Sequence, residues 1–147
     1  MQDSIERELQ LEISVERLWE LLTRAEHLGA WFGDAGAAVD LRPGGELVLR
    51  WHRYGVARGR VEKIEPRRTL SFRWAPFDDP EGDEPRPGNS TLVTFTLAPH
   101  EAGALLSVVE TGFAELDCAP PQRQRNLEDN RRSWDVELGH LAAYASP

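Results

Sequence analysis

Glu110 is the residue of this 147-residue chain whose position most suggests chemistry. In the segment 106–110, the alternation of a strand places its carboxyl on the same face as Leu106 and Val108. A carboxyl on an apolar face has a raised pKa unless a cation or hydrogen-bond donors stabilise its charge, and either state could hold a ligand group or act as a general base. Glu110 is therefore the one catalytic candidate, although a shifted strand register, or a glutamate at a strand end that reaches water, is the simpler interpretation.

The histidines, the cysteine and the short motifs of the chain indicate no metal, cofactor or nucleophile chemistry. The sequence holds no G-x-S-x-G, H-E-x-x-H, P-loop, G-x-G-x-x-G or C-x-x-C motif. Its four histidines are widely separated, and the single cysteine, Cys118, has no second thiol with which to form an internal disulfide. We therefore expect no metal and no cofactor, and a lone thiol is typical of the reducing cytoplasm.

Tryptophan is abundant, with five in the chain, and four of them are predicted to face inward. Such residues line apolar ligand pockets that carry a few polar anchors, although they also simply fill cores. Asn130 lies four residues before Trp134 on a predicted helix, so its amide can point inward, but a charged face exposed to solvent is the simpler interpretation. The residues predicted to line a ligand site are Trp31, Phe32, Leu49, Trp51, Val61, Phe72, Trp74, Val93, Phe95, Val108, Glu110, Asn130, Trp134 and Leu138.

Hydrophobic periodicity predicts the elements that would position these residues. A half-buried strand is expected over residues 5–11, followed by an amphipathic helix with Ser14 as its N-cap and a second short helix over residues 23–31. Two-residue alternation then predicts hairpin strands within 37–49, at 56–65, 70–74, 91–97 and 106–110, with Pro43-Gly44-Gly45 as a turn in the first range. A helix of about 22 residues is expected after Pro120.

These elements predict one α+β domain over residues 1–147, because strands joined by short turns pair antiparallel and leave no room for crossover helices. A curved antiparallel sheet of six to seven strands would wrap around the long C-terminal helix, with two short helices after the first strand. The helix and the bent sheet are expected to enclose an apolar cavity. Residues 76–88 hold four prolines and five acidic residues and predict a mobile loop without a packed core.

Charge and hydropathy exclude two classes of partner. The formal net charge of −8 and the isoelectric point near 5.0 repel phosphate backbones, so nucleic acid is not expected. No apolar segment approaches the length of about 18 residues that a membrane-spanning helix needs, and no leader-like segment opens the sequence. We therefore expect a cytoplasmic protein with no membrane span.

Short segments along nearly the whole chain resemble a known family. They lie at residues 13–23 (ISVERLWELLT), 25–32 (AEHLGAWF), 42–45 (RPGG), 59–66 (GRVEKIEP), 70–74 (LSFRW) and 110–113 (ETGF). In this order and spacing they are similar to the START-like, birch-pollen-allergen-like (SRPBCC) superfamily, and within it to homologues of the activator of heat-shock-protein-90 ATPase. The resemblance implies a helix-grip fold over the chain.

The same resemblance implies several activities, since the superfamily includes hydrophobic small-molecule carriers, polyketide cyclases and a chaperone regulator. The leading hypothesis is binding of a small hydrophobic ligand, lipid-like or polyketide-like, between the sheet and the C-terminal helix. One alternative is a cyclase or hydrolase that uses Glu110. The other is a chaperone-ATPase regulator or interaction module, with a chaperone contact or a homodimer. The lack of a convincing set of acid, base and nucleophile favours binding over catalysis.

Overall fold

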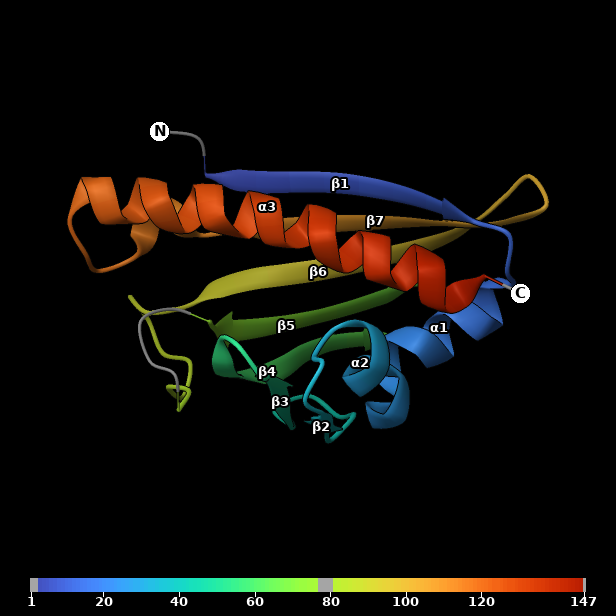
Figure 1. The fold of residues 1–147 in the computed structure, drawn as a ribbon, viewed down its shortest axis with the longest axis horizontal. Coiled ribbons are helices and arrows are strands. Elements are labelled where there is room, and N and C mark those ends of the chain that lie inside the picture. Colours follow the sequence, from blue (N-terminus) through green and yellow to red (C-terminus); the bar gives the residue numbers. More distant parts are fainter. Residues whose placement is uncertain (1–2, 77–80, 147) are drawn as a thin grey trace.

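The computed structural model describes residues 3–76 and 81–146, and it places seven strands in one antiparallel sheet (Figure 1). The order across the sheet is β1-β7-β6-β5-β4-β3-β2, so every hairpin predicted from the sequence joins neighbouring strands. The predicted α+β class is confirmed. The strands are β1 Ser4–Leu11, β2 Ala37–Val39, β3 Glu46–Trp51, β4 Gly55–Glu65, β5 Thr69–Ala75, β6 Thr91–His100 and β7 Gly103–Thr111.

Two short helices follow β1 and one long helix follows β7. Ser14 caps α1 (Val15–Thr23) as predicted, because its hydroxyl accepts from the backbone N–H of Arg17 at 3.0 Å. Arg24 adopts extended backbone angles and separates α1 from α2 (Ala25–Trp31). A single 3₁₀ turn, η1 (Phe113–Glu115), leads to α3 (Pro120–Ala145), whose 26 residues exceed the predicted length.

The turn between β2 and β3 shows why two glycines follow Pro43. Gly44 has a φ of +82°, a conformation that glycine adopts without strain. A Cβ on Gly45 would lie 1.9 Å from the backbone oxygen of Asp40, so no larger residue fits this position without backbone movement. The turn is also fastened to β4, since the Gly44 N–H donates to Val61 O at 2.7 Å and the Val61 N–H donates to Gly45 O at 2.9 Å.

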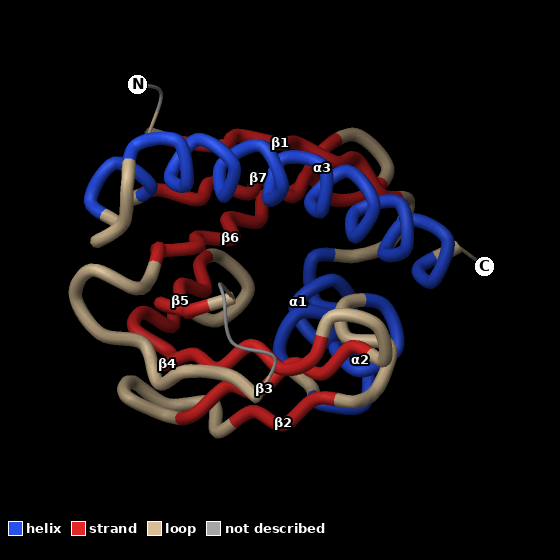
Figure 2. Tube along the Cα trace, turned by 60° about the vertical axis from the view of Figure 1, so that its left-hand side comes forward, coloured by secondary structure: helices blue, strands red, loops and turns tan. Residues whose placement is uncertain are grey.

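The concave face of the sheet holds the core, and α3 lies along it beside β1 and β7 (Figures 1 and 2). Strands β2 to β4 curve round to the opposite side, and α1 and α2 fill one end, where α2 packs against α3. A register shift in β4 between Val61 and Lys63 marks a bulge, a feature that increases the bend of a strand. The curvature therefore leaves the space between α3 and β3 to β5 to be filled by side chains.

The predicted loop at 76–88 falls partly outside the described residues, which omit 77–80. Residues 81–88 form no helix or strand, but they are more tightly bonded than their composition suggests. The Glu84 carboxylate accepts from Arg60 Nε at 2.5 Å, and the Asn89 amide donates to the backbone oxygen of Glu84 at 3.1 Å. Asn89 also accepts from the backbone N–H of Arg86 at 2.7 Å, which closes the segment on itself. The mobility of the loop stays a prediction.

Candidate ligand-binding site

Glu110 lies on the concave face as its parity predicts, and its side chain is completely buried. Four side-chain donors converge on its carboxyl. Oε2 accepts from the indole Nε1 of Trp74 on β5 at 2.8 Å and from the hydroxyl of Thr91 on β6 at 2.6 Å. Oε1 accepts from the indole Nε1 of Trp134 at 2.8 Å, and the Asn130 amide reaches both oxygens at 3.1 and 3.0 Å. These five residues, here called the Glu110 network, join α3 to three strands.

Burial and hydrogen bonding shift the pKa of Glu110 in opposite directions. Desolvation raises the pKa of the carboxyl above its ordinary value, and the bonds from Thr91, Trp74, Trp134 and Asn130 lower it by a smaller amount. An ionised carboxylate only accepts hydrogen bonds, so all four donors suit the charged form. A substrate proton could reach Glu110 only if one donor were displaced. The geometry therefore favours a fixed polar anchor over the general base considered from the sequence.

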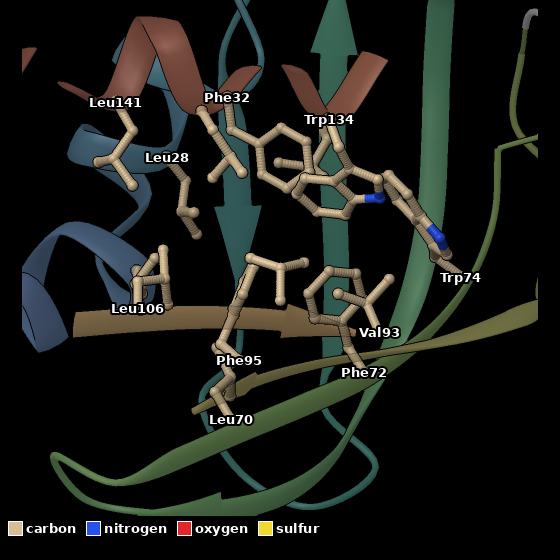
Figure 3. Packing of buried hydrophobic residues seen from close by; sticks show 14 of the residues in the cluster. Leu28, Phe32, Leu70, Phe72, Trp74, Val93, Phe95, Leu106, Trp134 and Leu141 are labelled. Atoms are coloured by element: carbon tan, nitrogen blue, oxygen red, sulfur yellow. The ribbon is translucent and has the colours of Figure 1, made fainter. Parts of the chain in front are cut away.

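An aromatic cluster surrounds this network, made of Phe32, Trp51, Phe72, Trp74, Phe95 and Trp134. Phe32, at the end of α2, occupies its centre, with ring centroids 5.7 Å from Trp74 and 5.5 Å from Trp134. Figure 3 shows the Trp134 and Trp74 indoles adjacent to one another beside Phe32, and their centroids are 6.1 Å apart. Tilted and edge-to-face contacts at these separations are favourable aromatic geometries.

The side chains of this cluster occupy part of the space between α3 and the sheet, where the sequence predicts a cavity. Among the described residues, an apolar void of about 10 Å³ remains, lined by Leu22, Leu28, Val39, Leu70 and members of the cluster. A void of this size holds about one water molecule. A surface groove of about 710 Å³ lies elsewhere, between the start of α1 and the β5–β6 region, and no residue of the predicted ligand site lines it.

The remaining predicted ligand residues take their places in the same core. They are all nearly inaccessible to solvent: Leu49, Val61, Val93, Val108 and Leu138. Trp31 has a packing role, because it stacks on Phe32 with centroids 4.9 Å apart and its indole donates to Leu21 O at 2.8 Å. Trp51 is half-buried at the end of β3 and is the member of the cluster closest to the surface. The residues predicted to line a ligand site thus lie together in the core. Their role in binding a ligand stays a prediction.

Glu137 on α3 is the functional candidate that the sequence analysis missed. It is 9% exposed, and its Oε2 is buried with no hydrogen-bond partner among the described groups. Desolvation, followed by the charge of Asp34, raises its pKa to about 8, and a hydrogen-bonding interaction with Trp51 works in the opposite direction. Helical spacing was the available signal, because Glu137 lies three residues after Trp134 and one turn before the buried Leu141.

Comparison with solved structures gives the same fold in proteins from several bacteria. The chain matches protein MLL2253 from Mesorhizobium loti with a TM-score of 0.76 and 22% identity, over 95% of this chain and 94% of that one. It matches the Aha1 dimer from Colwellia psychrerythraea with a TM-score of 0.73 and 17% identity, over 98% and 96%. DynU16, from the dynemicin biosynthetic locus, matches with a TM-score of 0.75 and 20% identity, over 98% of this chain and 47% of that one.

The sequence of the chain was also compared with curated proteins and with models of protein families. A search of curated proteins finds no match to the chain. None of the helices in the described residues is long and apolar enough to cross a membrane. A homodimer and a cytoplasmic location stay predictions for this chain. The model of the family described as "Activator of Hsp90 ATPase homolog 1-like protein" matches residues 12–145, so the chain belongs to that family, as the short motifs indicated.

Proposed function

We propose that the protein binds a small, mainly apolar molecule, lipid-like or polyketide-like, between the concave face of the sheet and α3. The observation that carries this proposal is the Glu110 network set among aromatic rings. Stability alone does not call for a carboxyl here, because well-packed apolar groups in place of a buried charged cluster are often neutral or stabilising. A few fixed polar groups among apolar and aromatic ones are what a site uses to orient an apolar ligand.

Asn130 is the member of the network best placed to exchange with a ligand. It is half-buried, whereas Trp74, Thr91 and Trp134 are almost fully buried. Its amide shares one pair of N–H groups between both carboxylate oxygens at 3.0 and 3.1 Å, longer than the other bonds to Glu110. A ligand N–H or O–H could take its place without leaving an indole N–H unpaired.

Side-chain movement is the route by which we expect a ligand to enter. The backbone of α3 packs closely against β1, α2 and η1, while aromatic side chains bridge the space between it and β3 to β5. Rotation of Trp74 and Phe32 therefore opens space without breaking the sheet. The small apolar void lined by Leu28 and Phe32 marks the end of the core toward which such a ligand would extend.

The proposal is tested with N-phenyl-1-naphthylamine, a neutral apolar dye that carries one N–H donor. We expect micromolar binding and quenching of tryptophan emission. In Asn130→Ala the affinity should be about tenfold higher, because the dye N–H then reaches Glu110 without displacing an amide whose hydrogen bond is worth about 1.5 kcal/mol. Gln124→Ala is the matched control, since Gln124 is exposed on the same helix and its amide donates to the carboxylate of Glu128. Binding no stronger than to an unrelated acidic protein of similar size would contradict the proposal.

A further inference from the structure

A surface groove lies where the start of α1 faces the turn between β4 and β5 and the end of β6, and its volume is about 710 Å³. α1 packs against β6 and β7 at this end of the sheet (Figure 1). Small-molecule sites typically enclose about 300–1,000 Å³, so this α1 groove, as we name it, is large enough for a small ligand. Its apolar lining comes from Val15, Leu97, Ala98 and Pro99. None of the five residues of the Glu110 network lines it, so the two sites are separate.

Two arginines from the turn between β4 and β5 give the α1 groove positive charge. Arg67 and Arg68 both line it, and within residues 3–76 and 81–146 neither forms an ion pair with an acidic side chain. Glu65, at the end of β4, has other partners. A hydrogen bond with Thr69, and next the charge of Lys63, lower the pKa of this carboxyl. The contribution of Arg68 is smaller, so its guanidinium keeps its capacity to pair with another anion.

The backbone of the turn holds the two arginines at the edge of the groove. The Arg68 N–H donates to Glu65 O at 2.9 Å, and the Leu97 N–H on β6 donates to Arg68 O at 2.8 Å. Arg67 has a φ of +64°, a conformation that glycine adopts without strain and that other residues seldom adopt. An arginine in a position where glycine would be less strained indicates a use for its side chain.

We propose that the α1 groove binds a small monocarboxylate, whose carboxylate pairs with Arg67 and Arg68 and whose apolar body covers the apolar lining. The planar guanidinium group donates two parallel hydrogen bonds to a carboxylate, which fixes the orientation of the head group. The lining also holds one acidic side chain, Glu16, so its two arginines and one glutamate leave a net charge of +1. A monocarboxylate matches this charge, whereas a phosphate monoester, with a charge of about −1.5 to −2, exceeds it.

The probes are octanoate and its neutral counterpart octan-1-ol, titrated into the isotopically labelled protein at pH 7 and low ionic strength. In two-dimensional NMR, the backbone amide signals of Leu97 and Ala98 report binding in the α1 groove. The indole N–H signals of Trp74 and Trp134 report binding at the Glu110 network. We expect octanoate to shift the groove signals with a millimolar Kd or tighter, about tenfold more strongly than octan-1-ol, because the alcohol has no charge for the arginines. Added salt should reduce this difference.

Three substitutions test the charge of the groove. Arg67→Gly should weaken octanoate binding about three- to fivefold, the scale of one partly exposed ion pair. The same variant should keep or raise the melting temperature, because glycine adopts the φ of +64° without strain, so unfolding would not explain the loss. Glu16→Gln should strengthen binding about two- to threefold, since it removes the negative charge of the lining. Arg53→Gln is the control, because Arg53 is exposed in the turn at the opposite end of β4, and it should leave binding unchanged.

The outcomes separate the α1 groove from the proposed function. Equal affinity of the groove for octanoate and octan-1-ol, or equal losses in Arg67→Gly and Arg53→Gln, would overturn the carboxylate site. Shifts confined to the Trp74 and Trp134 indoles would mean that octanoate enters the core, which would overturn the groove and leave apolar binding standing. Groove shifts by octanoate, together with failure of the apolar dye, would support the groove and contradict the function proposed above. Absence of groove shifts at concentrations that reveal a millimolar Kd would overturn the carboxylate site whatever the dye does.

Discussion

Replacement of Glu110 by leucine is expected to lower the melting temperature by about 10–15 °C. The change removes the acceptor for two buried indole N–H groups, a hydroxyl and an amide. Each buried donor left without an acceptor costs about 1–3 kcal/mol, so we expect a total loss of about 3–5 kcal/mol after the side chains relax. In a domain of this size, about 1 kcal/mol corresponds to a few degrees. Calorimetry and urea unfolding at pH 7 measure the loss.

Glu110→Gln tests the origin of that loss, because it keeps the shape of the side chain. A carboxyl in a purely apolar setting would tolerate this change, or gain from it, since a buried charge disappears. Here one acceptor oxygen becomes an NH₂ group that faces donors, namely the Trp134 indole or the pair Trp74 and Thr91. We expect a loss of about 1–3 kcal/mol.

The control for both variants is Glu8→Gln on β1, where the side chain is exposed and a change within about 0.5 kcal/mol is expected. If Glu110→Leu unfolds at the wild-type temperature, the network contributes nothing to stability. The role of Glu110 would then lie in ligand binding alone.

Glu137 is expected to make the protein less stable as the pH rises. Its pKa is raised from 4.5 to about 8 in the folded protein, so the folded state binds more protons than the unfolded state between these values. The stability attached to the neutral carboxyl is therefore fully present below pH 4.5 and is lost as the pH rises through 8. After allowance for screening by solvent, the loss should amount to about 2–3 kcal/mol.

Glu137→Gln isolates this contribution because glutamine stays neutral at every pH. We expect the variant to match the wild type at pH 5 and to exceed its free energy of unfolding by about 2–3 kcal/mol at pH 9, as measured by urea denaturation. All other groups titrate in both proteins, so the difference between the two curves reports the contribution of Glu137. Glu128→Gln should follow the wild type, and parallel curves for Glu137→Gln would mean that the carboxyl is ionised at neutral pH.

The local sequence pattern was sufficient to predict the helices and strands of this protein. It also predicted whether a residue lies on the inward or the outward face of its element. Alternation in residues 106–110 placed Glu110 inward, Ser14 marked the first helix, and the glycines after Pro43 marked a turn. These features depend on neighbours within a few residues, which a single sequence displays. The short family motifs then predicted the helix-grip arrangement that the sheet order confirms.

Only the tertiary structure decided the partners of these side chains. The donors to Glu110 come from positions 19 to 36 residues away. Their convergence depends on the register of the sheet and on the position of α3 against its concave face. The packing of the aromatic rings also required the folded chain, because periodicity shows that rings face inward but not which of them meet. Glu137 escaped notice since a lone glutamate on a polar helix is usually solvated. The influence of Asp34 on the pKa of Glu137 arises only in the folded chain, because more than one hundred residues separate the two carboxyls in sequence.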